Sequence, residues 1–109
     1  MSFEKSEFYY KVYGLNVKSE IKIDEFVPIE NSNYENAVSI KYSIMSEDIK
    51  ESIKNNKKAN FSKEEVWFYI DNVATYRVTN GNLIEFEPCE NADPYLLRVF
   101  LMCSCLGFI

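Results

Sequence analysis

The sequence predicts an α+β domain, in which an antiparallel sheet of about five to six strands is covered by one long apolar helix at the C-terminal end. Three observations lead to this prediction. Segments rich in β-branched and aromatic residues recur between residues 8 and 87, with turn residues between them. The stretch 66–87 holds three such segments in succession, as an antiparallel meander does. Residues 93–109 are almost entirely apolar and begin with a helix start signal.

The first part of the chain supplies the early strands. Segments 8–12 and 17–23 flank Gly14 and are expected to form two strands, or one bent strand. The Asn-rich segment 30–36 is expected to be a loop. Segment 37–43 alternates apolar and polar residues, so it predicts a half-buried antiparallel strand.

A short helix and a connection are expected next. Ser46 can cap a helix over residues 46–55, and Ile49 and Ile53 are four residues apart on one side of it. Two apolar anchors support only a peripheral helix. Segment 54–65 is mostly polar and is predicted to be a connection without regular structure.

The meander 66–87 is the clearest strand signal. Segment 66–70 is apolar throughout, which predicts a strand that is covered on both faces. A turn at 71–72 leads to the next strand, 73–79. A two-residue loop at 80–81 would mix polar and apolar side chains on each face of the following hairpin.

We therefore predict a three-residue hairpin loop, 79–81. In this register Tyr76 faces Ile84 across the two strands. Gly81 is predicted to be left-handed within a bulge, because glycine adopts positive φ without steric cost.

The terminal helix organises the predicted domain. Asp93 is a suitable N-cap and Pro94 suits the first helical position. Arg98 and Ser104 are its clearly polar residues, and Arg98 is expected to pair with an acid such as Asp93 or Glu87.

This helix is expected to meet a second protein surface. A sheet covers only one side of a helix, and this helix is apolar nearly all round. Apolar surface that is left in water marks a binding site. The candidate partner interface consists of Phe100, Leu101, Leu106, Phe108 and Ile109.

Charge and hydropathy argue against several kinds of partner. The chain carries 12 basic and 17 acidic residues, for a formal net charge of −5, so it would repel a nucleic-acid backbone. Its one lysine cluster, at 54–58, is interpreted as solvated surface. The apolar stretch 95–109 is shorter than the ~20 residues of a membrane span, and the first ten residues lack a signal-peptide core. We expect a cytoplasmic protein with no nucleic-acid or membrane partner.

No catalytic or metal-binding constellation is visible in the sequence. It contains no histidine, which excludes Ser–His and Cys–His pairs. Its cysteines, Cys89, Cys103 and Cys105, cannot complete a zinc site with histidine and are expected to be buried apolar residues. Its glycines, Gly14, Gly81 and Gly107, do not form a phosphate-binding loop. We expect no catalytic residue, metal or cofactor, and no enzymatic activity from this chain alone.

Several short motifs together carry a family resemblance. They are Tyr13-Gly14-Leu15, Ser19-Glu20-Ile21, Tyr76-Arg77-Val78 with Gly81, Glu87-Pro88, Ala92-Asp93, Arg98-Val99-Phe100-Leu101 and Ser104-Cys105-Leu106-Gly107. With these motifs the chain resembles the amino-terminal region of bacterial serine kinases related to HPr kinase/phosphorylase, some of which are labelled phosphoenolpyruvate carboxykinase-like. Cys103 departs from the resemblance, because a smaller residue is expected there.

The resemblance implies a role without catalysis. Residues 1–109 would be a single domain preceding a P-loop kinase module that is absent here, and would dock on that module, regulate it or present its substrate. Two alternatives remain open: a stand-alone peptide- or protein-binding module that adds a ligand strand to its sheet edge, and a self-associating structural domain. All three imply a protein partner, which is the kinase module, a peptide substrate or a second copy in a homo-oligomer.

Overall fold

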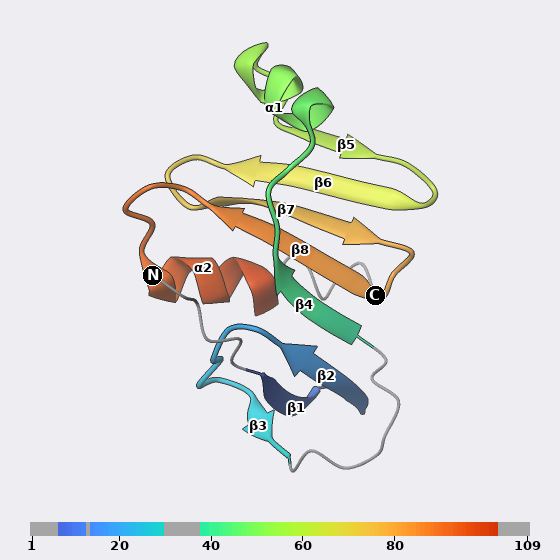
Figure 1. The fold of residues 1–109 in the computed structure, drawn as a ribbon, viewed down its shortest axis with the longest axis vertical. Coiled ribbons are helices and arrows are strands. Elements are labelled where there is room, and N and C mark those ends of the chain that lie inside the picture. The colour runs from blue at the N-terminus through green and yellow to red at the C-terminus, as the bar shows by residue number, and fades with distance from the viewer. Residues whose placement is uncertain (1–6, 13, 30–37, 103–109) are drawn as a thin grey trace.

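The computed structural model describes residues 7–12, 14–29 and 38–102 and contains one mixed sheet with two helices (Figure 1). The strands are β1 (Phe8–Val12), β2 (Leu15–Ser19), β3 (Val27–Pro28), β4 (Val38–Tyr42), β5 (Ala59–Phe61), β6 (Glu65–Ile70), β7 (Ala74–Thr79) and β8 (Leu83–Pro88). The helices are α1 (Glu47–Lys54) and α2 (Pro94–Phe100). The eight strands lie in the order β3-β1-β2-β4-β8-β7-β6-β5.

The predicted fold class is wrong in two respects. The described part of the sheet has eight strands and is mixed, because β4 runs parallel to both of its neighbours, β2 and β8. Alternation along a strand shows that one face is buried but does not encode direction, so segment 37–43 gave no sign of parallel pairing. The predicted long apolar helix is also replaced by the seven-residue α2, which is followed by a π-helical turn at Leu101 and Met102. The remainder of the predicted helix, 103–109, lies outside the described residues.

The meander prediction is confirmed. β6 pairs antiparallel with β7, and β7 pairs antiparallel with β8. In β6 the neighbouring residues Trp67 and Phe68 are both buried, although their side chains lie on opposite faces. This strand is therefore covered on both faces, as predicted.

The hairpin between β7 and β8 has the predicted faces but a different register. Tyr76 pairs with Phe86, not with Ile84. This shift of two residues keeps all three side chains on the same face of the sheet. On the other face Arg77 lies opposite Glu85, and their side chains form an ion pair at 2.7 Å.

The loop of this hairpin explains the register. Asn80 and Gly81 have φ values of 52° and 69°, and Asn82 N donates to the Thr79 carbonyl at 3.2 Å. Asn80 and Gly81 therefore form a two-residue turn with positive φ at both positions. Asn82 is the extra residue, and its carbonyl accepts from Ser39 N at 2.9 Å. This hydrogen bond to the start of β4 stabilises the bulge at Asn82. Because Ser39 and Asn82 are far apart in the sequence, the residues of the hairpin alone did not predict it.

The early strands agree with the prediction only in part. Segment 8–12 is β1, as predicted. β2 ends at Ser19 instead of continuing to residue 23, because the buried Ser19 hydroxyl accepts from Ile21 N and donates to the Ile21 carbonyl, which turns the chain. Gly14, between β1 and β2, has φ of 78°, a value that favours glycine.

Of the two segments that follow β4, the helix was predicted correctly, whereas the connection without regular structure was wrong. α1 has Ser46 as its N-cap and buries Ile49. The predicted connection 54–65 contains β5, which pairs with β6. β5 escaped the sequence analysis because it is a short edge strand with only Ala59 half-buried, so it lacks apolar alternation.

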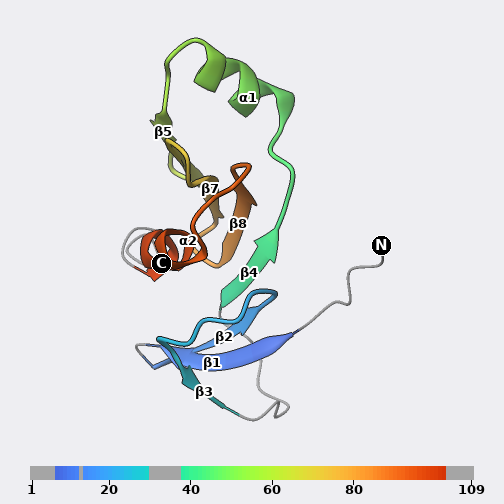
Figure 2. The ribbon, with the colours of Figure 1, turned by 90° about the vertical axis from the view of Figure 1, so that its left-hand side faces the viewer.

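Among the described residues, the buried side chains form two clusters on opposite faces of the sheet. The main cluster comprises Tyr10, Val17, Ile23, Val38, Ile40, Phe68, Val73, Ala74, Tyr76, Val78, Ile84, Phe86, Leu97 and Leu101. A smaller cluster joins Met45, Ile49 and Trp67, with Ile53 packed against it. Figure 2 shows α2 on one side of the sheet and the β4–α1 connection on the other. The main core thus lies under α2.

Candidate protein interface

The start of α2 forms as the sequence predicts. Asp93 is the N-cap, and its Oδ1 accepts from Tyr95 N at 2.8 Å. Pro94 occupies the first turn, where its missing N–H leaves no intrahelical bond unmade. These two residues set the point, after the end of β8, at which α2 begins.

The inner side of α2 is locked to the sheet. Leu97 and Leu101, four residues apart, are 5% and 0% exposed. The buried hydroxyl of Tyr76 donates to the Leu97 carbonyl at 2.9 Å. Because packing and a hydrogen bond act together, the rotation of α2 about its own axis is fixed, and so is its outer side.

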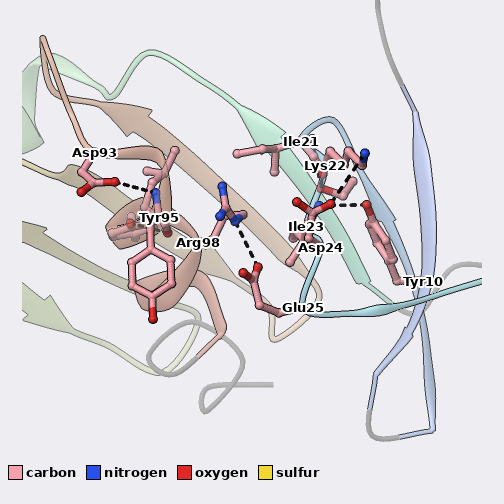
Figure 3. A network of polar contacts seen from close by, with 12 residues as sticks. Tyr10, Ile21, Lys22, Ile23, Asp24, Glu25, Asp93, Tyr95 and Arg98 are labelled. Carbon is pink, nitrogen blue, oxygen red and sulfur yellow. Dashed lines mark hydrogen bonds and ion pairs between the residues drawn. The ribbon is translucent and has the colours of Figure 1, made fainter.

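Arg98 ties α2 to the segment that follows β2 (Figure 3). Its Nε donates to Glu25 Oε1 at 3.0 Å. The predicted pair with an acid is confirmed, but the acid is neither of the two named examples: Asp93 caps the helix, and Glu87 Oε1 accepts from Met45 N at 3.0 Å. The pair is partly exposed, so it contributes about 1 kcal/mol or less and acts mainly to orient the two segments.

The segment that carries Glu25 is itself anchored in the core. Ile23 N donates to the Tyr10 hydroxyl at 2.8 Å, and Ile23 is fully buried (Figure 3). The ring of Phe26 contacts the Tyr10 ring edge-on, with centroids 5.6 Å apart. Tyr10 of β1 therefore holds the turn that contains Glu25 in place, and this turn positions the Glu25 carboxylate next to α2.

The outer side of α2 exposes apolar side chains. Tyr95 is 58% and Leu96 41% exposed, although both belong to the first turn of a helix that is anchored in the core. Val99 continues this surface and is half-buried, whereas the half-buried Phe100 and Met102 pack against the main core. We call Tyr95, Leu96 and Val99 the outer α2 surface.

The structure places two of the five predicted interface residues. Leu101 is fully buried in the main core, so it belongs to the inner side of α2. Phe100 is half-buried and packs against that core. Leu106, Phe108 and Ile109 lie outside the described residues, so their part in an interface stays a prediction.

The sequence analysis missed Tyr95 and Leu96, although a signal for Tyr95 existed. At 100° per residue, Tyr95 and Val99 each lie about 200° from Leu97 around the helix. If the side chain of Leu97 packs against the sheet, the side chains of Tyr95 and Val99 must point away from the sheet. The choice of Leu97 depends on the bond from Tyr76, which joins residues distant in sequence.

The sheet has two described edges, and they differ in character. β3 is two residues long and contains Pro28, which has no N–H to donate. β5 forms the other edge and pairs only with β6 among the described strands. Lysines flank β5 in the sequence, at positions 57, 58 and 63.

Two further polar groups, Lys58 and Cys89, have partners within the described residues. Lys58 Nζ lies 2.8 Å from Asp71 Oδ2, and this hydrogen bond raises the pKa of Lys58. Cys89 is half-buried, and its Sγ lies 3.9 Å from the Tyr69 hydroxyl. The contact with Cys89 is the main reason that the pKa of Tyr69 is raised. Cys103 and Cys105 lie outside the described residues.

A shallow apolar hollow of about 330 Å³ lies at the carboxyl ends of the parallel strands β4 and β8. Tyr42 and Phe86 line it with rings 4.4 Å apart, and Ile44 and Pro88 complete the wall. Burial raises the pKa of Tyr42, and the nearby Glu20 carboxylate adds to this shift. Glu87, which also borders the hollow, is engaged with Met45 N.

Within residues 7–12, 14–29 and 38–102, no three side chains of His, Cys, Asp or Glu come together in a way that could hold a metal ion. In the same part of the chain, no helix has the length and apolar character to cross a membrane.

Comparison with known proteins gives no relative. No protein-family model, curated protein or solved structure matches this chain. The resemblance to the amino-terminal region of HPr kinase-related serine kinases therefore stays a prediction, and the outer α2 surface has to be interpreted from its own chemistry.

Proposed function

We propose that this chain is a non-catalytic docking domain that binds a protein through the outer α2 surface. The exposure of Tyr95 and Leu96 on a helix whose inner side is anchored in the core carries this proposal. Aromatic and aliphatic side chains on a rigid element lose little conformational entropy on binding, which suits them to an interface.

The partner is a catalytic module or a second copy of the chain. If the resemblance to HPr kinase-related proteins holds, this is a cytoplasmic amino-terminal domain that docks on the kinase module or presents its substrate. In the isolated chain the same surface is then available to a second copy. Self-association is the form in which the proposal can be tested with this chain alone.

The test compares two charge substitutions at exposed apolar positions. The purified chain should sediment as a dimer or larger assembly at micromolar concentration. Leu96→Glu should yield a folded monomer, because a carboxylate would be desolvated at the contact. Val27→Glu is the matched control, since Val27 is 66% exposed on β3 and should leave the assembly intact.

Far-UV circular dichroism would confirm that both variants are folded. A well-folded monomer of the unsubstituted chain would refute self-association through α2. Equal dissociation by both substitutions would show that the assembly depends on overall charge and not on this helix.

The absence of catalysis is a separate prediction. The sequence has no histidine and no glycine-rich phosphate loop, so purified chain should not bind ATP at micromolar concentrations or transfer its phosphoryl group. Calorimetric titration with Mg-ATP and a radiolabelled phosphoryl-transfer assay would check this. Saturable nucleotide binding would contradict the proposal.

The open edge at β5 favours a second candidate function. A peptide in extended conformation can add a strand to an exposed sheet edge, where its backbone supplies affinity. β5 is such an edge among the described strands, whereas β3 is blunted by Pro28. The chain would then be a peptide-binding module.

A further inference from the structure

The ladder between β5 and β6 determines which backbone groups point away from the sheet. Tyr69 N donates to the Lys58 carbonyl at 2.7 Å, and Ser62 N donates to the Glu65 carbonyl at 2.9 Å. In an antiparallel ladder every second residue directs both of its backbone groups toward the partner strand. Ala59 follows Lys58 and therefore directs its N–H and C=O away from β6.

The position of Ala59 is fixed. It pairs with Phe68 in the register of the two strands, and its side chain is half-buried against the main core. Its outward N–H and C=O are thus held at the spacing that a further strand needs. α1 lies beyond β5 at this end of the sheet (Figure 2), and its Ile49 clusters with Trp67, whose side chain is on the face opposite the main core.

Positive charge gathers along this edge. The ten residues 54–63 contain four lysines, at positions 54, 57, 58 and 63, and no acid. Each of these lysines is exposed. Of these four lysines, only Lys58 makes an ion pair with another described residue, which is Asp71. A chain with a net charge of −5 therefore concentrates unpaired positive charge next to its open edge.

The positive charge beside β5 favours some strands over others as a partner at this edge. Pairing β5 with β5 of a second copy would bring the lysines together, and like charges oppose each other across a strand pair. A strand with carboxylates at its ends would instead place opposite charges side by side. We infer that the β5 edge binds an extended acidic segment of another protein by strand addition, an inference that rests on the second function proposed above.

The probe is a capped peptide of alternating glutamate and valine, added to ¹⁵N-labelled chain. Hydrogen exchange followed by NMR reads the strand addition directly. Exchange of the Ala59 amide should slow about tenfold or more at saturation, because its outward N–H gains an acceptor. The Asn60 amide, directed toward β6, should change little and is the internal reference.

Two double variants test the charge. Lys57→Glu with Lys63→Glu should weaken peptide binding roughly tenfold or more, since two favourable ionic contacts become repulsive. Lys11→Glu with Lys22→Glu is the matched control with the same change in net charge, placed on exposed positions of the N-terminal part. This control should bind the peptide nearly as well as the unsubstituted chain at low salt.

The outcomes separate the two levels of the proposal. If the glutamine analogue of the peptide slows Ala59 exchange as strongly as the glutamate peptide does, the acidic partner is wrong while strand addition stands. If neither peptide slows Ala59 exchange, strand addition at β5 is wrong as well. Binding that shifts lysine signals without protecting Ala59 would be electrostatic adsorption and would also overturn the inference.

Discussion

Replacing Phe86 with alanine should lower the free energy of unfolding by about 3–5 kcal/mol, the usual cost of truncating a buried aromatic side chain. Phe86 is 0% exposed and lies in β8, where it pairs with Tyr76 on one side and with Tyr42 on the other. The cavity would open in the middle of the main core. Because a domain of this size has a total stability of roughly 5–15 kcal/mol, the variant should be marginally folded.

Tyr42→Ala is the control for this variant. The two rings are 4.4 Å apart, but Tyr42 is 52% exposed, so its truncation should cost about 1 kcal/mol. Urea denaturation followed by far-UV circular dichroism would measure both values. Equal losses would show that Phe86 is not in a closed core.

The second large effect is expected on the inner side of α2. Leu97→Ala should destabilise the domain by about 2–5 kcal/mol, because Leu97 is 5% exposed and packs in the main core. Its neighbour Leu96 is 41% exposed, so Leu96→Ala should cost about 0.5 kcal/mol. The two substitutions are chemically identical and change helix propensity equally.

Their difference in urea denaturation therefore measures which side of α2 faces the sheet. It should be determined below the concentration at which the chain associates, because association adds to the apparent stability. If Leu96→Ala were the more damaging change in a monomer, the rotation of α2 would differ from the one described.

The sequence predicted correctly those elements that depend on residues close together in the chain. The cap at Asp93, the cap at Ser46 and the meander were confirmed because each depends on residues close in sequence. β5 was missed because an edge strand needs little apolar character. The parallel direction of β4 was missed because neither alternation nor composition encodes it.

The candidate site could be predicted only in outline. The apolar character of the terminal helix indicated a protein interface, but the choice of residues required knowledge of its rotation. That rotation is set by Tyr76, and the segment beside it is set by the pair of Arg98 with Glu25. Both contacts join residues far apart in the chain, so no local pattern contains them.

The central position of β4 also has a kinetic consequence. Among the described strands, it alone joins β1, β2 and β3 to the meander of β6, β7 and β8. Its pairs, such as Ile40 with Ile84, close long loops of chain, whereas each hairpin closes a short one. Long-range parallel pairing is slow to form. The meander should therefore fold early, and the two halves of the sheet should join late, when β4 docks along β8.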